Sequence, residues 1–226
     1  MAVAVMFPGQ GAQYAGMGMD LAEGHPIARD ILDQADGVLG FGLSDIIANG
    51  PDDELTRTDI SQPAILTVSW MAFSVLDKSC NPLRFDLAAG LSLGEYTALL
   101  AAGAMDFADA LRLVRLRGEA MQAAADAVPG GMVALVGTDE AGAEALCSAV
   151  RAEDEILTVA NLNSPGQVVI SGHRSACQRA VEQAREHGIR RAMPLPVAGA
   201  FHSPLMAPAA ERLHDALAGT ALRDPR

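Results

Sequence analysis

The first half of the chain alternates short apolar runs with segments that have helical periodicity. Residues 2–7 are an apolar run typical of a β-strand, and the glycine-rich stretch from Pro8 to Gln13 predicts a tight turn directly after it. A second apolar strand is expected over residues 86–89. Helices are predicted over residues 27–39, 44–49, 52–55, 60–77, 95–102 and 107–125.

The pattern changes after the turn at residues 128–131. Strands are predicted over residues 132–136, 156–161, 167–171 and 190–195, and helices over residues 140–151 and 174–187. The resulting order, β-α-β-β-α-β, is that of a ferredoxin-like unit. We therefore expect a small inserted subdomain at residues 128–197, and a larger subdomain made of residues 1–127 and 198–226, which ends in a helix over residues 206–217.

Ser92 lies in the segment with the strongest chemical signal. It stands between Gly90 and Gly94 as Gly-x-Ser-x-Gly, after an apolar run and before a helix-forming run. This arrangement is typical of a nucleophile elbow, a sharp strand-to-helix turn that exposes a serine hydroxyl. An ordinary glycine-containing turn is the alternative for a bare five-residue match, and the strand and helix on either side favour the catalytic interpretation.

A serine nucleophile needs a base, and His202 is the candidate. It follows a return loop directly after the predicted small subdomain, and such loops often carry functional groups. The other four histidines are expected at loops or helix surfaces: His25, His173, His187 and His214. From spacing alone, a catalytic role for His202 is only modestly favoured over a structural one.

Composition excludes several classes of function. The net charge of −12 argues against a nucleic-acid partner, and no apolar run approaches the ~18 residues of a membrane-spanning helix. The three scattered cysteines match no metal spacing, and the N-terminus carries no visible secretory signal. We therefore expect a reduced, cytoplasmic protein without a bound metal.

Six segments give the chain a resemblance to the malonyl-CoA:acyl carrier protein transacylases and the related acyltransferase domains of polyketide synthases. They occur in the family's order and together cover nearly the whole chain. They are Phe7–Gln13, Asp59–Ala64, Gly90–Tyr96, Arg115–Gly118, Asn161–Gly172 and Gly199–Ser203. The resemblance implies an α/β-hydrolase-like large subdomain with the inserted ferredoxin-like unit. It also implies an acyltransferase that carries malonyl from malonyl-CoA to an acyl carrier protein, without a cofactor.

The resemblance also assigns roles to individual residues. Ser92 matches the acylated nucleophile, and His202 matches its base. The backbone N–H groups of Gln10 and Leu93 match the oxyanion hole. Two further residues match the substrate pocket. Arg117 matches the arginine that pairs with the free malonyl carboxylate, and Phe201 matches an aromatic residue that leaves little room for an α-methyl branch. Pairing suits Arg117 chemically, because a guanidinium grips a carboxylate through two parallel hydrogen bonds.

The chain departs from the family pattern at two places. Leu91 stands where the family usually has a histidine, which puts rate or acyl preference in doubt. Family members also continue for several elements beyond the last matching segment. From this we expect a monomer that a further C-terminal segment completes. Two alternatives to transfer stay open: an acyl hydrolase of the same architecture that clears a carrier protein, and a non-catalytic carrier-docking fragment.

Overall fold

The computed structural model describes residues 2–225, which form two compact units. The first unit runs to Glu119 and resumes at Leu213, and the second is Ala120–Arg212. The divisions fall within two helices, α7 (Phe107–Ala127) and α10 (Ala207–Ala218). Because each unit has its own core, each is described by itself.

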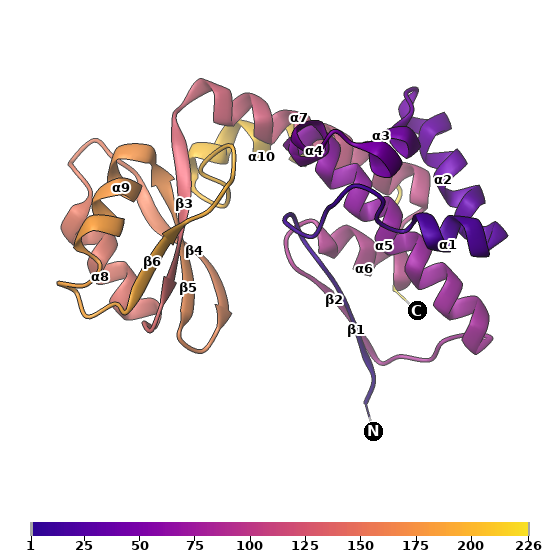
Figure 1. Cartoon of the computed structure of the whole chain (residues 1–226), viewed down its shortest axis with the longest axis horizontal. Coiled ribbons are helices and arrows are strands. Elements are labelled where there is room, and N and C mark those ends of the chain that lie inside the picture. The colour runs from indigo at the N-terminus through magenta and orange to yellow at the C-terminus, as the bar shows by residue number, and fades with distance from the viewer. Residues whose placement is uncertain (1, 226) are drawn as a thin grey trace. The chain divides into compact units, whose positions relative to one another are not determined.

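The first unit pairs two parallel strands, β1 (Ala4–Phe7) and β2 (Leu87–Gly90). Ala4 is the partner of Leu87, and Phe7 is the partner of Gly90. The helix α6 (Gly94–Ala101) contacts both strands, as Figure 1 shows. The other helices of this unit are α1 (Met19–Gly24), α2 (Pro26–Leu39), α3 (Leu43–Asn49), α4 (Asp52–Thr56), α5 (Thr58–Cys80) and the first part of α7.

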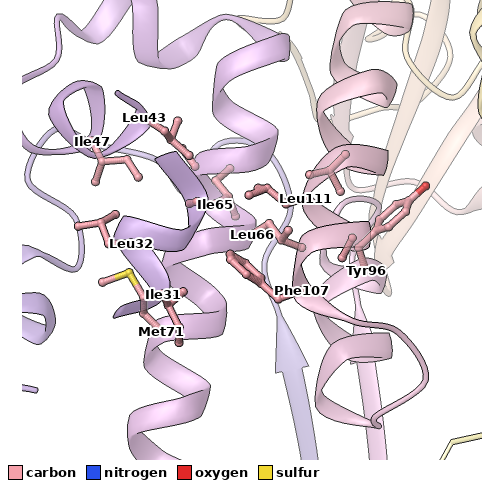
Figure 2. Close-up of a cluster of buried hydrophobic side chains, with 14 of the residues drawn as sticks. Ile31, Leu32, Leu43, Ile47, Ile65, Leu66, Met71, Tyr96, Phe107 and Leu111 are labelled. Atoms are coloured by element: carbon pink, nitrogen blue, oxygen red, sulfur yellow. The ribbon is translucent and has the colours of Figure 1, made fainter. Parts of the chain in front are cut away.

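The apolar faces of these helices form the core of the first unit. Figure 2 shows side chains from α2, α3, α6 and α7 packed together with those of α5, on which Leu66 and Met71 are fully buried. Tyr96 of α6 lies at the border of this cluster, and its hydroxyl points away from the other labelled side chains (Figure 2). The core therefore fixes α5, α6 and α7 against one another.

The second unit is built on a four-stranded antiparallel sheet in the order β4-β5-β3-β6. Along the chain the elements run β3 (Gly130–Val136), α8 (Glu140–Val150), β4 (Leu157–Ser164), β5 (Gln167–His173), α9 (Arg174–Gln183) and β6 (Arg191–Pro194). This connectivity and strand order are those of the predicted ferredoxin-like unit.

Both faces of this sheet are covered. The helices α8 and α9 pack on one face through an apolar cluster that includes Leu135, Leu146 and Ile170 (Figure 1). The opposite face carries Met132, Ala134 and Val169, which pack against the C-terminal part of α7 and the segment that contains Phe201 and Met206. These flanking residues therefore share a core with the sheet.

The structure confirms the α/β fold class and most of the predicted elements, with differences at element ends. Sequence pattern did not predict α1, a helix of six residues between glycines. The helix α5 begins at Thr58 rather than at residue 60, and α9 ends at Gln183 rather than at residue 187. A 3₁₀ turn, Pro204–Met206, precedes α10. The expected subdomain limits at residues 128 and 197 enclose the sheet and its two helices, and as domain limits they stay a prediction.

Candidate active site

Ser92 lies in the sharp turn between β2 and α6. The strand ends at Gly90 and the helix begins at Gly94, so only three residues separate them. Ser92 has a backbone φ of +51°, a left-handed conformation that costs a non-glycine residue about 1–2 kcal/mol. Such strain at a half-buried turn residue is typical of a functional site. The predicted elbow is therefore present as a strained strand-to-helix turn.

The two glycines of the motif allow backbone segments to approach closely. A Cβ atom on Gly90 would lie 1.9 Å from the carbonyl carbon of Gly94, and a Cβ atom on Gly94 would lie 2.3 Å from the carbonyl oxygen of Phe7. Both distances are far below van der Waals contact. Any side chain at either position would push β1, β2 and α6 apart, so the geometry of the elbow depends on these two residues.

The guanidinium of Arg117 lies next to the serine hydroxyl. Its Nη2 donates a hydrogen bond of 2.9 Å to Ser92 Oγ, and its Nη1 donates one of 2.6 Å to Gln62 Oε1. Arg117 belongs to α7 and Gln62 to α5. These helices meet closely at Gly118, which has no side chain: a Cβ atom there would lie 2.6 Å from the carbonyl oxygen of Thr58. Helix packing thus brings a cation to the Ser92 hydroxyl.

Arg117 carries a charge that its protein environment compensates poorly. Burial lowers the pKa of Arg117, with Tyr96 and Glu95 acting in the opposite direction, and burial also raises the pKa of Tyr96. The guanidinium stays protonated, because arginine does not lose its proton in proteins. Its central carbon lies 6.0 Å from the centre of the Tyr96 ring. The two groups that accept hydrogen bonds from Arg117, the Gln62 amide oxygen and the Ser92 hydroxyl, are neutral.

Two other arginines on the same helix provide a contrast. Arg112 pairs with Asp109, and Arg115 pairs with Asp59 and Glu119. Within residues 2–225, no aspartate or glutamate forms an ion pair with Arg117. A half-buried cation without a carboxylate partner is suited to an anionic ligand, because pairing then repays the cost of its burial.

Gln62 is a site residue to which sequence reasoning assigned no role. Its side chain is fully buried on α5, and it accepts the hydrogen bond from Arg117. One signal was available: an amide within an otherwise apolar, buried helix must find polar partners. The sequence pattern likewise assigns no role to Tyr96, whose ring lies beside the Arg117 guanidinium. Their contacts arise from the packing of α5, α6 and α7, which the sequence pattern does not resolve.

Changing Gln62 to glutamate tests whether Arg117 serves an anionic substrate group. The two side chains have nearly the same shape, but Gln62→Glu gives Arg117 a built-in carboxylate. We expect kcat/KM for a substrate with a free carboxylate to fall roughly ten- to a thousandfold, since the new charge both neutralises Arg117 and repels the substrate. The kcat/KM for an uncharged acyl group should change little. Equal losses for both would mean that Gln62 supports only the packing of α5.

Gln10 and Leu93, the two residues predicted to donate backbone N–H groups to an oxyanion, both lie near the elbow. Leu93 is the residue directly before α6, so its N–H lies at the helix N-terminus, where amides lack partners within the helix. The loop after β1 passes close to the elbow, because a Cβ atom on Gly9 would lie 2.7 Å from the carbonyl oxygen of Leu91. Gln10 follows in that loop and is half-buried. The oxyanion roles of Gln10 and Leu93 stay a prediction, as does the effect of the exposed Leu91.

His202 and Phe201 lie in the second unit. His202 is exposed and has a φ of +58°, a second strained non-glycine residue. Its neighbours anchor the loop: Phe201 is buried in the apolar cluster on the sheet, and Ser203 Oγ donates a hydrogen bond of 2.7 Å to the carbonyl oxygen of Ala200. Because Ser92 belongs to the first unit, its pairing with His202 stays a prediction. The role of Phe201 in excluding acyl groups with an α-methyl branch also stays a prediction.

The described residues hold neither a metal-ligand cluster nor a membrane-spanning helix. Residues 2–225 contain no group of three or more histidine, cysteine or acidic side chains placed to hold a metal ion. In the same part of the chain, no helix combines the length and apolar character needed to cross a membrane.

Known proteins resemble this chain over its whole length. The profile of the acyl transferase domain matches residues 5–226. The malonyl CoA-acyl carrier protein transacylase of Bacillus subtilis (strain 168) is 45% identical over 223 residues, which are 98% of this chain and 69% of that protein. The corresponding structure from Coxiella burnetii superposes with a TM-score of 0.94 at 39% identity, over 99% of this chain and 70% of the other.

A further solved structure includes a carrier protein. It is a complex of a type II polyketide synthase acyl carrier protein with its malonyl-transacylase, and it matches with a TM-score of 0.93 at 40% identity. The match covers all of this chain and 72% of the other. With an acyl transferase profile over nearly every residue and relatives above 40% identity, the chain belongs to the acyl transferase family.

Proposed function

We propose that this chain transfers a malonyl group from malonyl-CoA to the phosphopantetheine thiol of an acyl carrier protein. The transfer is a ping-pong reaction through a malonyl ester on Ser92. The relatives above carry the malonyl transacylase name, and one of them is held in complex with its carrier protein. The proposed steps need no metal or redox cofactor.

The position of Arg117 is the observation that carries the proposal. A malonyl group on Ser92 places a carboxylate a few bonds from Oγ, and the guanidinium already lies 2.9 Å from that atom. Two parallel hydrogen bonds from its planar fork would hold the carboxylate and supply the missing countercharge. A simple acyl group has no use for such a partner.

The first half-reaction forms the acyl-enzyme. Ser92 Oγ attacks the thioester carbonyl carbon of malonyl-CoA, and His202 takes the hydroxyl proton. The carbonyl oxygen becomes an oxyanion, which the N–H groups of Gln10 and Leu93 stabilise. When the C–S bond breaks, the sulfur of CoA leaves with the proton held by His202. Ser92 then carries the malonyl ester.

The second half-reaction repeats these steps with a different thiol. His202 takes the proton of the phosphopantetheine thiol on the carrier protein, and the sulfur attacks the ester carbonyl carbon. The same amides hold the oxyanion, and the C–O bond to Ser92 breaks as Oγ regains a proton from His202. The partners are therefore a coenzyme A thioester and an acyl carrier protein. We expect the protein to act as a monomer in the cytoplasm.

Replacing Arg117 with alanine tests the substrate assignment. Removing one member of a buried charged pair costs about 2–5 kcal/mol, mostly because the partner is left unpaired. At about 1.4 kcal/mol per tenfold change, kcat/KM for malonyl-CoA should fall roughly thirty- to several-thousandfold. Acetyl transfer should not fall in parallel, because acetyl has no carboxylate. Lysine at this position should rescue only part of the loss, since it lacks the planar fork.

Arg112→Ala is the matched control for Arg117→Ala. Arg112 is an exposed arginine on the same helix and already pairs with Asp109, so its loss should leave both substrates unaffected. Equal losses for malonyl-CoA and acetyl-CoA in Arg117→Ala would reduce Arg117 to a structural role. A partition assay with a thiol acceptor and water separates transfer from hydrolysis: predominant hydrolysis of the malonyl ester with a carrier thiol present would favour the acyl hydrolase.

A further inference from the structure

Asp59 is a buried carboxylate in the first turn of α5, and two arginines contact it. Its side chain is only 7% exposed. Arg57 donates hydrogen bonds of 3.1 Å from Nε and 2.9 Å from Nη2 to its two carboxylate oxygens. Arg115 of α7 has its Nη1 3.2 Å from Asp59 Oδ2, and the same atom donates a hydrogen bond of 2.7 Å to the Asp59 carbonyl oxygen. Asp59 therefore ties α7 to the start of α5 through both its side chain and its backbone.

The face of α7 that packs on α5 has Gly118 at its middle. A Cβ atom on Gly118 would lie 2.8 Å from the Cα atom of Asp59, so the two helix backbones touch there. At about 100° of rotation per residue, Arg115 and Arg117 lie on either side of Gly118 around the helix. On one flank Arg115 reaches Asp59. On the other flank Arg117 reaches Gln62, about one turn further along α5.

We propose that Asp59 is a positioning residue for the carboxylate-binding group of the site. Its contact with Arg115, on one flank of Gly118, fixes the rotation of α7 about its own axis. That rotation decides where Arg117 points on the other flank, and so holds Nη2 at 2.9 Å from Ser92 Oγ. A misplacement of about 1 Å can cost roughly a hundredfold in rate. This role rests on the proposed function, in which Arg117 binds the malonyl carboxylate.

Asp59→Asn tests this role, because it keeps the shape of the side chain and removes its charge. We expect kcat/KM for malonyl-CoA to fall roughly ten- to a hundredfold and kcat/KM for acetyl-CoA to change by less than about threefold, since only malonyl needs Arg117 in place. In an Arg117→Ala background the same substitution should change malonyl transfer by less than about threefold, because effects that pass through one contact are not additive. Equal losses for both substrates, or an undiminished loss in the Arg117→Ala background, would overturn the proposal.

Glu119→Gln is the matched control. Glu119 also pairs with Arg115, at 2.7 Å, but both residues belong to α7, so this pair cannot fix α7 against α5. The ratio of malonyl to acetyl transfer should therefore stay within about twofold of the unaltered chain, as is usual for an exposed pair.

Arg115→Met is a second variant, in case loss of the buried carboxylate unfolds the chain. It leaves Asp59 paired with Arg57, and its unbranched stem can still pack on the Phe41 ring. The ratio of malonyl to acetyl transfer should fall in the same direction as in Asp59→Asn. An unchanged ratio in folded Arg115→Met would contradict the proposal.

A measurement without substrate separates this proposal from the proposed function. The Nε–H group of Arg117 gives an NMR signal that is identified by its loss in Arg117→Ala. Asp59→Asn should shift or broaden this signal, whereas Glu119→Gln should leave it in place. An unchanged signal in Asp59→Asn would overturn the positioning role even if malonyl transfer falls. If Arg117→Ala leaves malonyl transfer unaffected, the proposed function fails instead, and the signal still reports whether Asp59 positions Arg117.

Discussion

We expect no malonyl adduct on the Ser92→Ala or Ser92→Gly variant, whereas the unaltered chain should gain the mass of one malonyl group on the peptide that contains Ser92. We expect this result because the proposed ester forms on the Ser92 hydroxyl, and neither alanine nor glycine carries a side-chain oxygen that could replace it. Intact-mass and peptide mass spectrometry after incubation with malonyl-CoA measure it directly.

The two variants together separate chemistry from stability. Ser92 is held at a φ of +51°, so alanine keeps the left-handed strain while glycine removes it. The Ser92→Gly variant should therefore lie within about 1 kcal/mol of the unaltered chain in its free energy of unfolding, and still fail to acylate. Labelling that persists in either variant would move the nucleophile elsewhere. Absence of an adduct on the unaltered chain would favour the carrier-docking fragment.

The elbow could be predicted because its determinants are local. One glycine ends the strand and another begins the helix, with three residues between them, which allows only a tight turn. The sequence contains all of these signals within Leu87–Ala101. The same holds for the second unit, whose strands and helices follow short patterns read in order. Local pattern also explains the errors: α1 has only six residues, too few for a clear helical period.

The environment of Arg117 could not be predicted in the same way. The sequence shows three arginines on one predicted helix, Arg112, Arg115 and Arg117. Only tertiary packing distinguishes their environments. Arg112 and Arg115 meet acidic side chains, whereas Arg117 meets Gln62 from a helix 55 residues away and Ser92 from the elbow. Its partners depend on the close approach of α7 to α5 at Gly118. Resemblance to a family singled out Arg117, while the contacts supply the physical reason.

Replacing His202 should slow acylation of Ser92 by four to six orders of magnitude. Loss of the base in a serine triad leaves only oxyanion stabilisation and substrate binding, a residual of about 10³–10⁴ over water. The loop that carries His202 is anchored by Phe201 and Ser203, so a change of the exposed side chain should leave the second unit folded. Rapid-quench measurement of malonyl-enzyme formation gives the rate.

Two variants and an added base make this result specific to proton transfer. Asparagine tolerates the left-handed conformation at a φ of +58° better than alanine, so His202→Asn controls for backbone strain. Both variants should lose acylation equally. Added imidazole should restore part of the rate to His202→Ala, because a small base can occupy the space left by the side chain, and it should restore nothing to Ser92→Ala. Normal acylation by His202→Asn would mean that another residue is the base, and the return loop of the second unit would then have no part in activating Ser92.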